Sequence, residues 1–496
     1  MRIYVLFFLP FFLTSCFQND IDTPLEIVSW GEEIKKEIRE EIVVPKIKTT
    51  IQEEALVDES EQIIQKPKWV KLQGTEIFVS SQGDDDNNDG TTQQQAYRTI
   101  QKALDRVEPG QIVYIQAGKY SPQSLSFPQS GLPGKPIILE WYSKIPGDTP
   151  IIQGFDYKSS LDPEFSPLLD GGNRAIGKWF ILKWREYISL KNLQISNYSI
   201  WIDISKTNHV YLENIILTEL WNIQAKYNGK GISMRWENSK NTLKRITVVN
   251  AAAEWIFISW NNHILDNIHV YADDSSTATK SATDYYIVLT GVHNSVVKNS
   301  YIERVGELAH RGHGFSLKWN NTGNTIKDNI AVNMDNGGFV VRHRGTQGNT
   351  FIGNEIRGWA IGLLVRDGAS NNVFQDISIL KTMDAIVFLD STEDEWKQWW
   401  GSDNTFENIT IKGTERYIFS FNGNTYRDTV SARNHFSYFQ IEWGKYLIEW
   451  GHVAQDNILE NSSISWVSKY IQLKNRIKEG NIDFILKDVD ILDSGF

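Results

Sequence analysis

A repeat of 24 residues between positions 314 and 390 constrains the fold of this chain more than any other feature. The segment Gly314–Trp319 aligns with Gly338–His343 and Gly362–Asp367, and more loosely with Ile386–Asp390. A short, fixed period of strand-like segments separated by Asn-centred turns is typical of a solenoid, in which each repeat forms one coil. The repeat therefore predicts an all-β chain of stacked coils.

The same repeat places a cation at one position of three successive coils. Lys318, Arg342 and Arg366 lie 24 residues apart, and stacked coils bring equivalent positions within about 4.8 Å of one another. Two like unit charges about 5 Å apart repel by roughly 3 kcal/mol at an effective dielectric constant of 20. We therefore expect these three residues, the cation column, either to be solvated or to face an anion.

Asn-centred turns recur along the chain and favour the same architecture. The turns begin at Asn208, Asn241, Asn262, Asn294, Asn324, Asn349, Asn372, Asn404 and, more distantly, Asn457. Asn tolerates the left-handed backbone of a sharp corner, and its side-chain amide can bond to the Asn one coil away. We therefore expect side-chain hydrogen bonds between successive coils.

The N-terminal residues predict export and lipid attachment. Arg2 precedes the apolar run Ile3–Leu13, which has the length of a signal peptide rather than of a membrane span. Leu13-Thr14-Ser15-Cys16 resembles a bacterial lipobox, so residues 1–15 would be removed and Cys16, the only cysteine, lipidated. Phe17 in place of Asp after the lipobox resembles lipoproteins of the outer membrane. The alternative is an ordinary signal peptide with an incidental cysteine.

Residues 16–72 differ in composition from the rest of the chain and predict a charged, flexible tether. Residues 73–496 are long and regular enough for one solenoid domain. The formal net charge of −11 belongs partly to the tether. Acidity and export together disfavour nucleic acid as a partner. We expect a monomer that meets the membrane through its lipid anchor.

A distinct pattern opens the folded body. A predicted helix at Arg98–Val107 precedes strand-like segments such as Ile112–Ile115 and Ile137–Leu139, and a helix at this point suits a cap over the open end of a solenoid. Residues 76–154 resemble the N-terminal region of the pectate-lyase-like superfamily, especially family 9 pectate lyases and chondroitinase-B-like enzymes. This resemblance implies a right-handed parallel β-helix and an activity on acidic polysaccharide.

Strand alternation predicts which side chains of the repeat face outward. In Phe315-Ser316-Leu317-Lys318 it sends Ser316 and Lys318 outward and the two apolar side chains inward. The same alternation turns Val340 and Leu364 outward, which indicates a covering loop or a ligand-binding groove.

Further charged and aromatic residues surround the cation column in the sequence. They are Arg311, His313, Trp319, His343, Arg344 and Asp367. So many cations and histidines favour a groove that binds an anionic glycan. The alternative is a charged outer wall balanced by Glu303, Glu307 and Asp335.

These residue types suit β-elimination of a uronate polysaccharide, in which a cation neutralises the carboxylate next to the acidic C5 proton. Lys318 is the candidate base because Lys, unlike Arg, can lose its proton when crowded by cations. His313 or His343 would serve equally well. The planar forks of Arg342 and Arg366 suit them to hold carboxylates.

The resemblance implies a related set of roles. Family 9 lyases use a lysine base and a calcium site built mainly of aspartates, whereas chondroitinase-B-like enzymes use a Lys and Arg pair with calcium held by Asn and Glu. Lys318 and Arg342 echo that pair in type, although the surrounding motif does not match. Calcium is left open without assigned ligands. The turn Asp84–Asp89 is either a loose calcium site or an acidic turn.

Two other functions stay open. Asp284, Asp367 and Asp390 would be the carboxylates of a hydrolase of the same fold. The 18 tryptophans suit a glycan-binding protein without catalysis. In that case the insertion Trp396–Trp400, with Trp399, would be a sugar platform or a lid.

Overall fold

The structure, a computed structural model, describes residues 76–121, 124–143, 163, 166–172, 178–198, 200–218, 230–251, 254–272, 284–305, 312–389, 401–422, 430–450, 453–473 and 482–492. Several predicted features lie outside these ranges: the signal peptide, Cys16, the tether, Arg311 and the insertion Trp396–Trp400 with Trp399. Among the described residues, no helix has the length and apolar character needed to span a membrane.

The described residues form one helix and 30 strands. The first elements are β1 (Glu76–Val79), α3 (Ile100–Leu104), β2 (Ile112–Gln116), β3 (Gly118–Tyr120), β4 (Leu125–Ser126), β5 (Ile137–Tyr142), β6 (Pro167–Asp170), β7 (Lys178–Lys183), β8 (Ile188–Ser196), β9 (Ile200–Ser205), β10 (Tyr211–Thr218), β11 (Lys230–Arg235), β12 (Thr242–Val249), β13 (Glu254–Asn261), β14 (Ile264–Ala272) and β15 (Asp284–His293). The others are β16 (Val296–Lys298), β17 (Tyr301–Arg304), β18 (Gly312–Lys318), β19 (Thr325–Lys327), β20 (Ile330–Met334), β21 (Phe339–Arg342), β22 (Thr350–Ile352), β23 (Glu355–Arg366), β24 (Val373–Leu389), β25 (Thr405–Asn422), β26 (Val430–Ala432), β27 (His435–Ser437), β28 (Gln440–Trp450), β29 (Val453–Leu473) and β30 (Ile482–Leu492).

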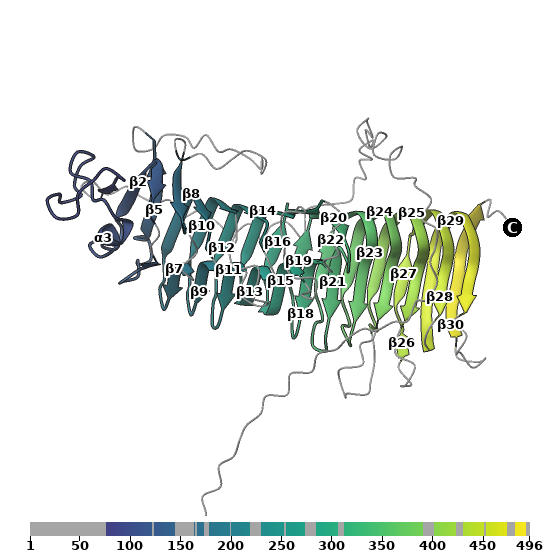
Figure 1. The fold of residues 1–496 in the computed structure, drawn as a ribbon. Helices are drawn as coiled ribbons and strands as arrows, with labels where there is room; N and C mark the ends of the chain where they lie inside the picture. The colour runs from purple at the N-terminus through teal and green to yellow at the C-terminus, as the bar shows by residue number, and fades with distance from the viewer. Residues whose placement is uncertain are drawn as a thin grey trace, which may run out of the picture. The chain divides into compact units, whose positions relative to one another are not determined.

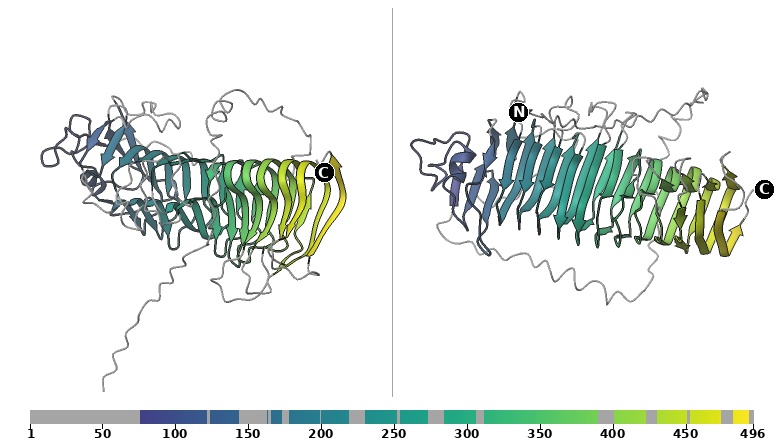
Figure 2. Two further views of the ribbon diagram at one scale, coloured as in Figure 1. Left: turned by 45° about the vertical axis from the view of Figure 1, so that its right-hand side comes forward. Right: turned by 90° about the horizontal axis from the view of Figure 1, so that it is seen from below.

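These strands form a right-handed parallel β-helix, as the sequence predicts. The named strands pair in parallel with strands one coil earlier and one coil later, so that β10 lies between β8 and β12, and β21 between β18 and β23. Figures 1 and 2 show successive strands side by side in chain order, from the purple N-terminal strands to the yellow C-terminal ones. Equivalent residues of successive coils therefore form columns.

The 24-residue repeat corresponds to one coil. Phe315 pairs with Phe339, and Phe339 pairs with Leu363. The two phenylalanine rings stack inside the coil with centroids 4.9 Å apart and planes 7° apart. Residues 24 positions apart occupy equivalent positions in neighbouring coils, so charges and rings that recur with this period stack on one another.

The glycines that begin each repeat are required by close packing between coils. A Cβ atom added at Gly314 would lie 2.3 Å from the carbonyl oxygen of Gly338, and one at Gly362 would lie 2.5 Å from that of Ala385. Backbone atoms cannot yield as a flexible side chain can. Glycine therefore holds these positions for steric reasons.

The helix α3 occupies the predicted cap position but is shorter than the sequence suggests. The N–H of Lys102 donates to Oγ1 of Thr99, the N-cap residue, over 3.3 Å. Ile100, Ala103 and Leu104 are buried, and the helix packs against β1, β2 and β4. One face of α3 thus covers the apolar start of the β-helix.

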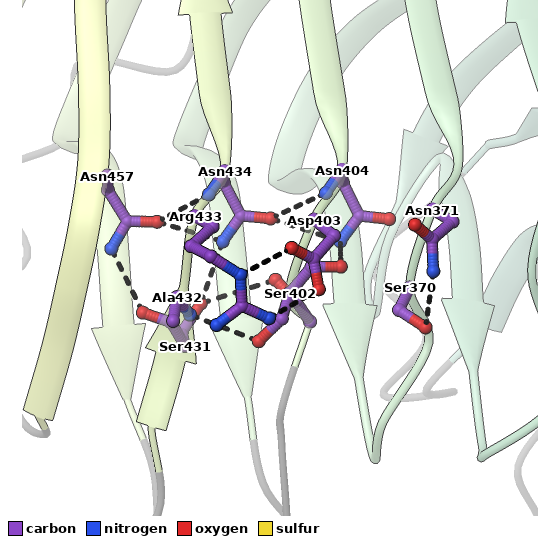
Figure 3. A network of polar contacts seen from close by, with 11 residues as sticks. Ser370, Asn371, Ser402, Asp403, Asn404, Ser431, Ala432, Arg433, Asn434 and Asn457 are labelled. Atoms are coloured by element: carbon purple, nitrogen blue, oxygen red, sulfur yellow. Dashed lines mark hydrogen bonds and ion pairs between the residues drawn. The ribbon is translucent and has the colours of Figure 1, made fainter.

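A ladder of buried asparagines links the C-terminal coils. We call it the asparagine ladder, and its members are Asn324, Asn349, Asn372, Asn404, Asn434 and Asn457. Each side-chain amide donates to the side-chain oxygen of the next member over 2.9–3.1 Å. Figure 3 shows the last three members side by side on neighbouring strands. The predicted bonding between coils is therefore confirmed here.

Four of the predicted turn asparagines, Asn208, Asn241, Asn262 and Asn294, lie outside this ladder, and the last two occupy the exposed corner position. Asn262 and Asn294 have left-handed backbones, with φ of 58° and 52°, and the equivalent buried positions belong to the next residues. The N–H of Asn241 donates to Nδ1 of His263, and the N–H of His263 donates to Oγ of Ser295. The prediction is wrong by one residue at these two turns because Asn is common at both positions of the corner.

Candidate functional site

The cation column lies along one sheet of the β-helix. We call this sheet the site sheet, and it consists of β7, β9, β11, β13, β15, β18, β21 and the C-terminal parts of β23 and β24. Lys318 pairs with Arg342, and Arg342 pairs with Arg366. The predicted row of three cations is therefore confirmed at the level of the backbone.

A carboxylate supplies charge next to the two arginines of the column. Nε of Arg366 donates to Oδ2 of Asp367 over 2.8 Å, and a guanidinium nitrogen of Arg342 lies 3.4 Å from the same oxygen. The Asp367 side chain is only 2 % exposed, and both arginine side chains are 13 % exposed. These arginines therefore already hold one carboxylate group in a largely desolvated place.

The predicted counter-charges for an outer wall lie elsewhere. Asp335 forms an ion pair with Arg304, whose side chain is buried. Glu307 lies outside the described residues. Asp367, which lies outside that predicted set, is the carboxylate beside Arg342 and Arg366.

Lys318, His313 and Tyr285 meet at the N-terminal end of the column. Nζ of Lys318 lies 4.0 Å from the centre of the Tyr285 ring, which stacks on His313 with centroids 5.0 Å apart. Tyr285 pairs with His313 in neighbouring strands of the site sheet. Tyr285 lies five residues before Thr290, the partner of Lys318. Strict strand alternation would therefore have turned Tyr285 inward, and no signal in the sequence pointed to it.

The two histidines of the site are held in their neutral forms. Burial, with the charges of Arg342 and Arg366, holds the pKa of His313 well below its usual value. Nδ1 of His313 lies 2.9 Å from the carbonyl oxygen of Asn336, to which it can donate as the neutral tautomer. Burial and the charge of Arg342 lower the pKa of His343 to about 3. Such a histidine binds a proton weakly at neutral pH.

The outer edge of the site combines an exposed indole with polar side chains. Trp319 is 46 % exposed, and its ring stacks on the buried ring of His343 with centroids 3.6 Å apart and planes 9° apart. Arg344 follows in the next turn and is exposed. Trp319 therefore lies between the largely buried cation column and the protein surface.

The outward apolar residues of the site sheet are buried. Val340, Leu364 and Val387 form a small cluster on the outer side of the sheet, against which Ile361 and Leu389 pack. The turn before β21 lies over this cluster, because a Cβ atom at Gly337 would lie 2.8 Å from Cγ2 of Val340. The outward direction of Val340 and Leu364 predicted either a covering loop or a ligand-binding groove. At this point of the sheet a covering segment is present.

The described residues offer no evident calcium ligands. No three His, Cys, Asp or Glu side chains come together within them. In the turn Asp84–Asp89, Oδ1 of Asp84 accepts from the N–H groups of Asp86 and Asn87, and Oδ1 of Asp85 accepts from the N–H groups of Arg98 and Thr99. These carboxylates stabilise the turn and the start of α3, so we derive no step through a metal.

The carboxylates considered for hydrolysis are not assembled into a site by the described residues. Asp367 lies against Arg342 and Arg366. The side chain of Asp284 and the whole of Asp390 lie outside the described part of the chain.

Comparisons with solved structures found distant likenesses to polysaccharide lyases. A family 6 polysaccharide lyase from Pseudopedobacter saltans is 11% identical, with 80% of this chain and 91% of that chain covered and a TM-score of 0.45. A mannuronic-acid-specific family 6 lyase from human gut microbiota is 12% identical, with coverage of 76% and 80% and a TM-score of 0.43. An alginate lyase from Paenibacillus sp. is 14% identical, with coverage of 72% and 94% and a TM-score of 0.34.

These likenesses are too distant to carry an argument about activity. A search of curated proteins found no match. A family model described as "Protein of unknown function (DUF1565)" matches residues 81–387, which include α3 and the whole cation column. The chain therefore belongs to the DUF1565 family.

Proposed function

We propose that this protein is a lyase that cleaves an acidic, uronate-containing polysaccharide by β-elimination at the cation column. In this proposal Lys318 is the base, and Arg342 and Arg366 bind the carboxylate of the uronate. We also propose that it works at the cell envelope, where a lipidated Cys16 would anchor it to the outer membrane.

The observation that carries the proposal is the carboxylate already bound in the column. Arg342 and Arg366 converge on one oxygen of Asp367, so their spacing suits a carboxylate group. A guanidinium has five N–H donors, and the Nε contact with Asp367 engages one of those of Arg366. The base must be close to the carboxylate that the arginines neutralise. Lys318 meets this requirement because it lies one coil away from Arg342.

β-Elimination breaks one C–H bond and one C–O bond of the uronate. The base takes the C5 proton of the uronate, the electron pair of that C–H bond forms a C4=C5 double bond, and the C4–O4 bond breaks. O4 leaves with the bonding pair and takes up a proton from a water molecule. Arg342 and Arg366 would stabilise the charge that develops on the carboxylate in the transition state. Lys318 would carry the C5 proton away.

The direct test is the absorbance of the unsaturated uronate while the full chain is incubated with polygalacturonate, alginate or chondroitin, with and without calcium. We expect a rise with one substrate. The variant Lys318→Ala should lose at least about 100-fold in rate, because a positioned base contributes that much. Lys327→Ala is the control, since Lys327 is exposed and lies on β19, outside the site sheet. Full activity of Lys318→Ala would remove Lys318 as the base.

A glycan-binding protein without catalysis is the second candidate, and the exposed tryptophans favour it. Trp319 borders the column, and further tryptophans are exposed on the same sheet edge. This alternative predicts binding of the polysaccharide with neither a rise in absorbance nor new reducing ends. New reducing ends without a rise in absorbance would instead indicate hydrolysis.

A further inference from the structure

Four exposed tryptophans lie at the end of the site sheet, each directly after its strand or within its last residues. Trp184, Trp236, Trp260 and Trp319 are 63 %, 67 %, 43 % and 46 % exposed. Each has a left-handed backbone, with φ between 59° and 77°. A bulky side chain is uncommon in this conformation, and a large exposed indole gains no burial energy. We call these four residues the tryptophan track.

The other left-handed corners of the coils have a different composition. The corner that follows the track carries mainly Asn262, Asn294, Gly323, Gly348, Asn371 and Asp403, with Tyr187, His209, Lys240 and Arg433 in other coils. The next corner carries mainly Asn267, Asn299, Asp328, Gly353, Asp376 and Asn408, with Arg245 and Tyr438 in other coils. Asn, Asp and Gly adopt this backbone easily. The corner conformation alone therefore does not explain why tryptophan occurs four times along one edge.

The backbone register places the track in one line along the coils. Lys183 pairs with Ser205 and Ser205 with Arg235, so Trp184 and Trp236 lie two coils apart. The register continues through β11, β13, β15 and β18, apart from a one-residue shift at Gly291, where Ser259 pairs with Thr290 and Trp260 with Val292. Five coil steps of about 4.8 Å thus place Trp184 and Trp319 roughly 24 Å apart. A row of this length matches an extended polymer rather than a small molecule.

The track ends at the candidate active site. Trp319 directly follows Lys318 and stacks on His343, and His343 follows Arg342 of the cation column. At the other end, Nζ of Lys206 lies 4.0 Å from the ring centre of Trp184, and Arg235 directly precedes Trp236. Lys206 also pairs with Glu237, and Arg235 with Glu254. The indoles at the two ends of the track therefore have cationic neighbours, and those at the cation column suit a chain with both sugar faces and negative charges.

We propose that the tryptophan track is a binding surface for an acidic polysaccharide chain, which it leads along the sheet edge to the cation column. The apolar faces of pyranose rings stack on the indoles, and the flanking cations attract the carboxylates. This inference rests on the proposed function, because it assigns the binding surface of the same site. It also makes recognition depend on chain length, since only a long oligosaccharide reaches Trp236 while occupying the column.

The test replaces two track residues with the residue common at the other corners. Trp236→Asn/Trp260→Asn keeps the backbone conformation without strain, so the melting temperature should not fall. The control pair is Trp443→Asn/Trp466→Asn, because both residues are exposed and left-handed but lie on β28 and β29, away from the track. Binding of the full chain to alginate, polygalacturonate and chondroitin is measured by affinity electrophoresis.

We expect the track variant to bind the polymer roughly five- to tenfold more weakly per tryptophan removed, with the control pair unchanged. A short oligosaccharide that fills only the column should bind both proteins equally. Equal binding of the polymer by wild type and track variant overturns the proposal, as does an equal loss in the control pair. A wild-type chain that binds none of the three polymers overturns it too.

The two proposals fail separately. If the track variant loses binding while the wild type produces no unsaturated uronate, the track is supported and the lyase is not. If the wild type cleaves the polymer and the track variant cleaves and binds it equally well, the lyase is supported and the track is overturned.

Discussion

At the scale of single residues, the most informative group is the carboxylate of Asp367. It lies between two largely buried arginines and is itself 2 % exposed. Removing one partner of such a buried group leaves charge without compensation. Asp367→Asn should therefore lower the free energy of unfolding by about 3 kcal/mol, measured by urea unfolding. Added acidic oligosaccharide should restore part of this loss, because a ligand of the folded state stabilises it.

Asp403 provides the matched control for this variant. It also has a left-handed backbone and pairs with an arginine, Arg433, through two contacts of 2.6 and 2.7 Å (Figure 3). Both side chains of that pair are more than a third exposed. Asp403→Asn should thus change the stability by less than about 1 kcal/mol. Equal losses in the two variants would contradict the special position of Asp367.

A buried histidine should make the fold sensitive to acid. Nδ1 of His263 accepts from Asn241, and Nε2–H donates to the carbonyl of Ser259. Burial lowers the pKa of His263 to about 4, against about 6.5 in an unfolded chain. Below pH 6.5 the unfolded state binds more protons than the folded one, so the stability from this group is complete above 6.5 and falls toward pH 4.

His263→Asn tests this effect, because Asn is the residue of the equivalent ladder positions in later coils. The loss of unfolding free energy between pH 7 and pH 5 should be about 2 kcal/mol smaller in the variant than in the wild type. Urea unfolding at the two pH values measures it. The same loss in both proteins would show that His263 does not titrate as proposed.

The sequence predicts the position of some site residues better than their partners. The row of Lys318, Arg342 and Arg366 follows from the period alone, because one period is one coil. The pairing of Asp367 with the arginines depends on side-chain direction at a left-handed corner, which alternation along a strand does not describe. Tyr285 was missed for a related reason, since the longer coil before Lys318 has no 24-residue spacing to align it.

At the scale of elements, the asparagine ladder stabilises the coils through buried hydrogen bonds. Asn372 accepts from the backbone and side chain of Asn349 and donates to the side chain of Asn404. Asn372→Ala would leave several buried groups unsatisfied, and each such group costs about 1–3 kcal/mol. We expect a loss of about 3 kcal/mol or more in urea unfolding.

A variant of the neighbouring residue distinguishes the effect of the buried ladder from that of the left-handed corner. Asn371 is exposed and left-handed, with φ of 54°, so Asn371→Gly keeps the backbone conformation and should change the stability little. A loss in Asn371→Gly equal to that in Asn372→Ala would contradict the role assigned to the buried amide.

The sequence predicts the positions of some elements more accurately than those of others. The Asn-centred turns identify the corners, but two adjacent residues of a corner both favour Asn, so the prediction is off by one at Asn262 and Asn294. The predicted helix at Arg98–Val107 is longer than α3 because residues beyond Leu104 form turns rather than a further helical segment. Local propensity sets the start of this helix, at the Thr99 cap, more sharply than its end.

At the scale of the whole molecule, the fold class follows from the sequence because the period repeats one local unit many times. The surface over the cation column does not follow in the same way. The coils differ in length, from 22 residues between Lys183 and Ser205 through 31 between Ser259 and Thr290 to 51 between Ile137 and Ile188, and the extra residues have no period. Periodicity therefore predicts the columns but not the segments that cover them.

The parallel register between coils also has a mechanical consequence. A force that pulls the two ends of the coiled region apart along its axis loads the hydrogen bonds of the terminal coil first, because each coil bonds only to its neighbours. Coils of 22 to 31 residues would then release roughly 75 to 105 Å of extended chain each. Single-molecule pulling should show a series of such steps, and one abrupt release of the whole length would contradict it. A solenoid held at one end would thus yield to tension by unwinding gradually from its free end, while coils deeper in the stack keep their binding surface intact.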